Sequence, residues 1–195
     1  MNRKFLIVTL SLLYFNLSFG QNLNDGQKRW SSANKLSFDD YKIKISGQNA
    51  DVVYSQFKIS HSIGGLDFLK NNLNKKIENI FLGNASWIDT TKVENIQKQI
   101  EFQQIQFDLS EVYVREFRKK ILQNKGQIVK GFDIVREIDN EVMEEFSRKR
   151  AELMEQTESG RNQEEVLIWK EWITGQLAAL KEFSYDNKNK IKLTD

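Results

Sequence analysis

Apolar and polar residues follow two different periods along this chain, and the change comes near Trp87. Before it, Leu36 to Ile45 ends in apolar/polar alternation, Val52 to Ile59 alternates again, and Ile77 to Leu82 is a short apolar run. Such runs predict strands. Gly47, Gln48 and Asn49 supply a turn between the first two, and Gly64-Gly65 breaks the chain after the second.

After Trp87 the apolar residues recur at helical intervals. We predict one long helix over 91–123, opened by a capping box from Thr91 to Glu94 and ended by Gly126 and Gly131. A second helix follows from Phe132 into the charged stretch 148–152, and a third begins near Asn162. The order of elements predicts an α+β fold, with a small N-terminal antiparallel sheet followed by three helices.

The first twenty residues have the pattern of a signal peptide. Arg3 and Lys4 precede an apolar run that extends to Phe19, and small residues favour cleavage before Gln21. The alternative is an uncleaved N-terminal anchor, but the apolar run is short for a membrane span. We therefore expect an exported protein, periplasmic or extracellular, with one domain over 21–185, a frayed polar tail over 186–195 and no stable membrane span after cleavage.

Composition and charge exclude some classes of function. The chain has 195 residues and no cysteine, so it has neither a lipid attachment site after the apolar run nor a disulfide framework. Loss of Arg3 and Lys4 with the leader leaves 27 basic residues against 27 acidic ones. A neutral balance argues against nucleic acid as a partner.

The residues offer little catalytic chemistry by themselves. His61, at the end of the second predicted strand, is the one histidine, so neither a second histidine nor a cysteine can complete a transition-metal site with it. Carboxylates at Asp139, Glu141, Glu144 and Glu145 alternate with arginines on the second predicted helix. That pattern predicts a solvated helix face with i,i+4 ion pairs rather than an acid–base pair.

A resemblance gives a sharper hypothesis. Ser86-Trp87, followed by the segment from Phe102 to Arg115, resembles a family of predicted secreted zinc-dependent proteases. In that family a Ser-Trp pair precedes a helix of the form H-E-Q-x-H-F-D-I-x-E-x-x-A-R. Leu36 to Tyr41 (Leu-Ser-Phe-Asp-Asp-Tyr) also resembles the family's opening L-T-W-x-D-F, and Gln156 to Gly160 resembles its Y-D-x-E-T-x-H-G segment. The resemblance implies that 91–123 corresponds to a zincin-like active-site helix.

The chain departs from the family where the metal would bind. Phe102 and Gln106 stand at the two histidine positions, Gln103 stands at the glutamate, and Ser159 stands at the third expected ligand. Phenylalanine has no lone pair, and a glutamine amide is a poor zinc ligand and no base. The positions that match the family are framework positions: Trp87, Gln104, Phe107, Asp108, Glu111, Arg115, Thr157 and Gly160.

The resemblance therefore implies an exported, non-catalytic relative of these proteases with no metal and no cofactor, which binds an unknown protein or envelope partner. One alternative is a hydrolase with a relocated site, in which Asp108 or Glu111 converges with His61 or Ser159. Another is a helical interaction module that docks through Trp169 and Trp172. An ion pair from Glu111 to Arg115 and an interior hydrogen bond of a carboxylate would explain the retained charges structurally.

Overall fold

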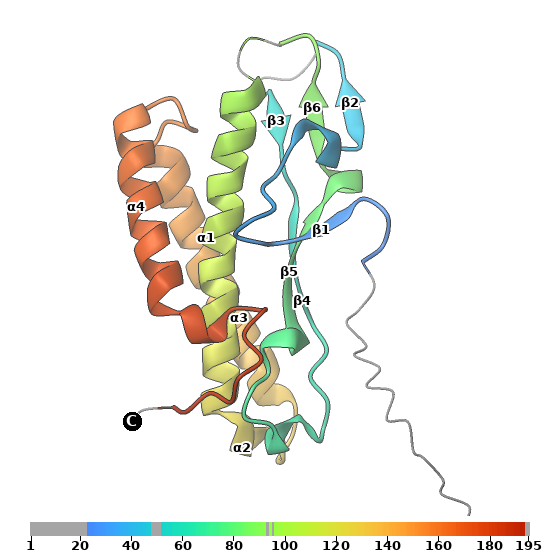
Figure 1. Ribbon diagram of the computed structural model, residues 1–195, viewed down its shortest axis with the longest axis vertical. Coiled ribbons are helices and arrows are strands. Elements are labelled where there is room, and N and C mark those ends of the chain that lie inside the picture. The colour runs from blue at the N-terminus through green and yellow to red at the C-terminus, as the bar shows by residue number, and fades with distance from the viewer. Residues whose placement is uncertain (1–22, 48–51, 93, 95, 194–195) are drawn as a thin grey trace, which may run out of the picture.

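The computed structural model describes residues 23–47, 52–92, 94 and 96–193, and it has the α+β architecture (Figure 1). The predicted leader over 1–20 lies outside these residues, as do Gln48 and Asn49 of the predicted turn. Six short strands come first: β1 (Gln27–Arg29), β2 (Ile43–Ile45), β3 (Val53–Tyr54), β4 (Phe57–His61), β5 (Ile77–Leu82) and β6 (Trp87–Asp89). Four helices follow: α1 (Ile96–Gln123), α2 (Lys125–Ile128), α3 (Asp133–Gln156) and α4 (Gln163–Ala179).

The strands form two three-stranded sheets rather than one. In the first, β5 lies between β1 and β4, and both pairings are antiparallel. In the second, β6 lies between β2 and β3, and the β2–β6 pair is parallel. The chain passes from one sheet to the other three times, between β1 and β2, between β3 and β4 and between β5 and β6, so the sheets continue one another along α1 (Figure 1).

Two strand predictions differ in detail from the structure. The run over 52–59 is split at Ser55 and Gln56, whose other bonds interrupt the strand: the Ser55 hydroxyl lies 2.9 Å from that of Tyr41, and Gln56 N donates to Ser86 Oγ. The run over 36–45 keeps strand only at its end. Residues 38–40 form a 3-10 turn, since Ser37 N and Oγ both donate to Asp40 Oδ2.

Helix α1 is the centre of the fold. The sheets lie on one side of it and α3 and α4 on the other (Figure 1), so side chains are buried on nearly every face, among them Leu109, Val114, Phe117 and Ile121. It begins five residues later than predicted, and Thr91 does not cap it. The Thr91 hydroxyl instead donates to Asp89 Oδ1 at 2.6 Å, which closes a turn at the end of β6.

The later helices follow the predicted pattern with one addition. α1 ends at Gln123, and Gly126 lies inside the short helix α2, which was not predicted. The prediction for the third helix is confirmed, because Asn162 caps α4 by accepting a hydrogen bond from Glu165 N. In the described part of the chain no helix is long and apolar enough to cross a bilayer.

The polar segment after α4 is tied to the body of the protein over much of its length. The side chain of Asn72 donates to the carbonyl oxygens of Asn187 and Asn189, and Ile191 N donates to Asn71 O. Ile191 is itself buried. The segment up to this residue therefore differs from the frayed tail that its composition suggests.

Candidate functional site

The turn between α3 and α4 lies against the first motif position. Gly160 has φ +88°, and a Cβ built there would lie 2.6 Å from Cγ of Phe102, so the ring rests directly on the glycine. Ser159, the third expected ligand position, precedes this glycine in the same turn, with φ 58°. The structure thus brings positions 102 and 159 into one neighbourhood, where a buried phenyl ring fills the space.

Two residues that match the framework positions of the motif shape this turn. The Thr157 hydroxyl donates to Leu153 O at 2.6 Å and accepts a hydrogen bond from Gly160 N at 3.2 Å. Thr157 is fully buried. A larger residue at position 160 would be strained in its backbone, because φ is positive, and its Cβ would clash with the Phe102 ring. Both residues therefore have structural reasons for their identity.

The second histidine position holds a hydrogen bond to an arginine. Gln106, on the α3 side of α1, accepts a hydrogen bond at Oε1 from Arg150 Nε at 2.9 Å. Its Nε2 is buried and has no partner within the described residues. The Arg150 guanidinium lies 5.8 Å from the centre of the Phe57 ring, and no carboxylate is paired with it in the parts of the chain that are described. Burial lowers the pKa of Arg150.

Gln103 and Trp87 lie on the sheet side. Gln103 is buried, and its Nε2 makes a long hydrogen bond of 3.4 Å to Val53 O in β3. Trp87, which matches the tryptophan of the motif, stacks on Tyr54 across the β3–β6 pair, with ring centres 6.0 Å apart. Phe107 faces the other sheet, where it stacks on Phe57 of β4 with ring centres 5.0 Å apart. Both of these aromatic residues therefore pack against other aromatic rings of the sheets.

Asp108 joins α1 to the N-terminal segment. Its Oδ1 accepts hydrogen bonds from Trp30 Nε1 and Gln104 Nε2, both at 2.7 Å, and its Oδ2 lies 3.2 Å from Lys35 Nζ. Gln104 Oε1 in turn accepts a hydrogen bond from Leu36 N at 2.7 Å. The match at 36–41 and the match at 104–108 are therefore in contact through this cluster.

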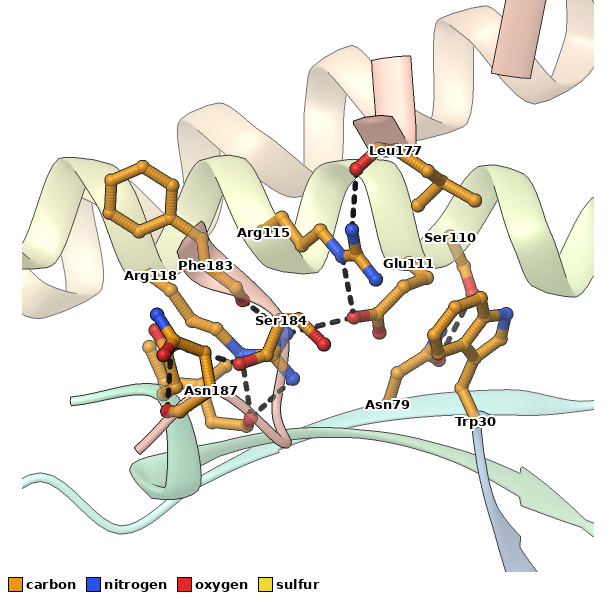
Figure 2. Close-up of polar contacts among 12 residues, drawn as sticks. Trp30, Asn79, Ser110, Glu111, Arg115, Arg118, Leu177, Phe183, Ser184 and Asn187 are labelled. Carbon is orange, nitrogen blue, oxygen red and sulfur yellow. Dashed lines mark hydrogen bonds and ion pairs between the residues drawn. The ribbon is translucent and has the colours of Figure 1, made fainter. Parts of the chain in front are cut away.

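The predicted ion pair between Glu111 and Arg115 is confirmed, and it belongs to a larger buried network (Figure 2). Arg115 Nε donates to Glu111 Oε1 at 3.1 Å, and Arg115 Nη1 donates to the carbonyl oxygen of Leu177 at 2.6 Å. Nη2 of Arg115 has no hydrogen-bond partner among the described residues, and no dashed line reaches it in Figure 2.

Arg118 is the member of this network that sequence reasoning missed. Its Nη1 donates to Glu111 Oε1 and to Phe183 O, both at 2.8 Å, and Nε and Nη2 donate to Ile77 O. With 1% of its surface exposed, it joins α1 to β5 and to the segment after α4. Its position among the basic residues Lys119 and Lys120 in the sequence gives no signal of this role. Glu111 is thus one carboxylate shared by two buried guanidinium groups.

A cavity of about 630 Å³ opens on the α4 side of α1, where the segment around residues 30–36 covers it. The cluster residues Gln104, Asp108 and Arg115 line it, and Lys35, Glu101 and Lys170 are exposed at its edge. Most of its wall is apolar, formed by Trp30, Leu36, Ile105, Ile173, Leu177 and Ala178. Three separate segments contribute, so no single stretch of sequence indicates the cavity.

The groups required by a relocated hydrolase site do not come together. Asp108 and Glu111 take their hydrogen bonds from the partners described above, and none joins them to His61 or Ser159 in the described residues. His61 is exposed, and its ring meets the edge of Phe117. Nor does any group of three or more His, Cys, Asp or Glu side chains gather to hold a metal ion within this part of the chain.

The charged face of α3 differs in its pairing from the prediction. Glu141 and Glu145 pair with Lys120 of α1, at 2.8 and 3.8 Å, rather than with arginines of their own helix. Of the two tryptophans on α4, Trp169 is buried and Trp172 is 37% exposed.

Comparison of the chain with protein-family models, curated proteins and solved structures finds no match.

Proposed function

We propose that this chain is an exported, non-catalytic binding protein, built on the frame of the secreted zinc-protease-like family that its motifs resemble. One observation carries the proposal: the neighbourhood of the four substituted positions holds a phenyl ring and a guanidinium group. Phe102 occupies the space beside Gly160, and Arg150 bonds to Gln106. A fixed positive charge there opposes binding of a metal cation.

Zinc content and hydrolysis test the non-catalytic role. The purified protein is dialysed against zinc, and bound metal is measured by atomic emission while a peptide library is screened for cleavage. We expect less than a tenth of an equivalent of tight zinc and no cleavage. One equivalent of tightly bound zinc, or cleavage that Asp108→Asn abolishes, would refute the proposal, and the second result would favour the relocated hydrolase.

A gain-of-metal experiment tests the assignment of positions. The variant Phe102→His, Gln103→Glu, Gln106→His, Ser159→His rebuilds the family's ligand set, and adding Arg150→Gln removes the opposing charge. We expect the fivefold variant to bind zinc more tightly than the fourfold one, while Arg150→Gln alone binds none. If the fivefold variant gains no zinc, the alignment of the chain with the motif is wrong.

The interaction-module hypothesis keeps one observation in its favour. Leu167, Ile168 and Trp172 of α4 are exposed by 65%, 54% and 37%, which is unusual for large apolar side chains on one helix. Under the proposed role this face would contact an envelope partner. Cross-linking from a photoreactive residue at Leu167 in exporting cells, compared with one at exposed Glu144 on α3, tests for such a partner.

A further inference from the structure

We infer that the cavity between α1, α4 and the segment around residues 30–36 binds an amphipathic carboxylate, with Arg115 receiving the acidic group. The ligand class is an apolar chain or ring system with one carboxylate, as in a fatty acid or the C-terminus of an apolar peptide. This inference deepens the proposed binding role and rests on it. At about 630 Å³ the cavity lies within the range of small-molecule sites, about 300–1,000 Å³.

Charge balance indicates an anion. Asp108 is matched by Lys35, and Glu101 and Lys170 offset one another at the edge of the cavity. Glu111 alone faces both Arg115 and Arg118, so the network at the inner end of the cavity holds one positive charge without a matching carboxylate. Both guanidinium groups are at least nine-tenths buried. Buried charges are ordinarily paired, and a ligand carboxylate would complete this set.

The geometry of Arg115 indicates where that carboxylate would bind. Nε and Nη1 are used by Glu111 and Leu177, which leaves the Nη2 donors for a ligand in the cavity that Arg115 lines. The guanidinium carbon lies 5.2 Å from the centre of the Trp30 ring, and the hydrogen bonds to Glu111 and Leu177 hold the group in place. A guanidinium held in this way is a preorganised donor to a carboxylate.

The remaining wall specifies an apolar body. Ile105, Ile173 and Ala178 present only hydrocarbon to the cavity, and Leu177 adds its side chain beside Arg115. Hydrocarbon buried against these side chains contributes about 0.8 kcal/mol per CH₂ group when it leaves water completely. An apolar chain is therefore favoured over a second charged or strongly hydrated group.

The test compares decanoate with decanol by isothermal titration calorimetry on the purified protein, because the two differ only in the acidic group. A tri-leucine peptide with a free carboxylate and its amide form a second arm, which distinguishes a fatty acid from a peptide C-terminus. We expect one of the two acids to bind at one site at least tenfold more tightly than its uncharged counterpart, as a charge-assisted hydrogen bond implies.

Two variants locate the site. Ala178→Phe, at an exposed position of α4, fills the cavity and should weaken binding of the acid at least tenfold, whereas Ala179→Phe, outside the lining, should leave it unchanged. Arg115→Met should reduce affinity for the acid to that for the uncharged counterpart, with exposed Lys181→Met as the control for charge. If Arg115→Met fails to fold, the Ala178→Phe pair and the acid-to-neutral ratio decide.

The inference is overturned if neither acid binds up to millimolar concentration, if the uncharged molecules bind equally well, or if Ala178→Phe leaves binding intact. These failures would leave the non-catalytic role standing. Conversely, tight zinc or peptide cleavage by the wild-type protein would refute that role whatever the carboxylates do. The two hypotheses therefore fail on different measurements.

Discussion

The contact between Phe102 and Gly160 makes a quantitative prediction about how the neighbourhood of the motif is filled. Gly160→Ala should destabilise the protein through two separate effects. Alanine at φ +88° carries a backbone cost of about 1–2 kcal/mol. Its Cβ would also lie 2.6 Å from a ring atom of Phe102, which is 3% exposed, and overpacking at a buried site costs about 1–3 kcal/mol. The total loss of unfolding free energy is about 2–5 kcal/mol.

A double-mutant cycle separates the two effects. In a Phe102→Ala background, itself destabilised by about 3–5 kcal/mol, the ring is absent and only the backbone cost of Gly160→Ala remains. Urea unfolding of the wild type, both single variants and the double variant should therefore give a coupling energy of about 1–3 kcal/mol. Gly175→Ala in α4 is the control, since no atom lies within 4 Å of its Cβ position and it should be neutral or stabilising by about 0.5–1 kcal/mol.

Equal costs of Gly160→Ala in the two backgrounds, within about 0.5 kcal/mol, would refute the reasoning. Phe102 would then not rest on the α3–α4 turn, and the space beside the third ligand position would not be filled as described. A second possible result is a large cost of Gly175→Ala, which would show that glycine substitution in α4 perturbs the fold for reasons unrelated to the contact. The coupling energy could then not be assigned to the ring.

Further predictions concern the buried charges. Glu111→Gln should lower the unfolding free energy by about 3–5 kcal/mol in urea, because it leaves two buried guanidinium groups unpaired. Arg115→Met should lower it by about 1–3 kcal/mol, since Arg118 keeps Glu111 paired. A smaller loss for Glu111→Gln than for Arg115→Met would contradict the charge balance. Burial by itself would raise the pKa of Asp67, but hydrogen bonds from Lys70 and Gly64 N outweigh it and hold the pKa below its usual range. This stabilisation is present above the unfolded pKa of about 3.9 and is lost as pH falls through the folded pKa. Asp67→Asn should therefore flatten the decline in unfolding free energy below about pH 4. An unchanged decline would exclude Asp67 as its source.

The helices could be predicted from the sequence because their signals are local. Apolar residues at helical spacing define α1, and Asn162 before the last helix is an ordinary cap. The start of α1 was misplaced because Asp89 competes for Thr91, and a side-chain bond to a strand residue has no helical signature. The split between β3 and β4 likewise depends on Tyr41 and Ser86, far away in the sequence.

In the candidate site, too, local spacing could be predicted and contacts between distant residues could not. Spacing placed Phe102 and Gln106 on one face of a helix, and that face does meet the segment holding Ser159 and Gly160. The arginines that complete the two clusters, Arg118 and Arg150, could not be chosen from among many basic residues. Apart from Glu111, which pairs with Arg118 along α1, their partners lie 41 or more residues away, at backbone carbonyls and at an amide.

The two sides of α1 differ in what the residues of the motif contact. On the side facing α3, the Phe102 ring packs on Gly160 and Gln106 accepts a hydrogen bond from Arg150. These interactions stabilise the fold without a ligand. On the side facing α4, Asp108 and Arg115 line the cavity. The network of Glu111, Arg115 and Arg118 at its inner end holds a positive charge without a matching carboxylate. Stability alone does not require that charge, because apolar residues of similar volume in place of buried ion pairs are often as stable or more so. The proposed ligand would therefore give Arg115 a role beyond the fold, and such a role is compatible with the proposed absence of metal chemistry on the other side of α1.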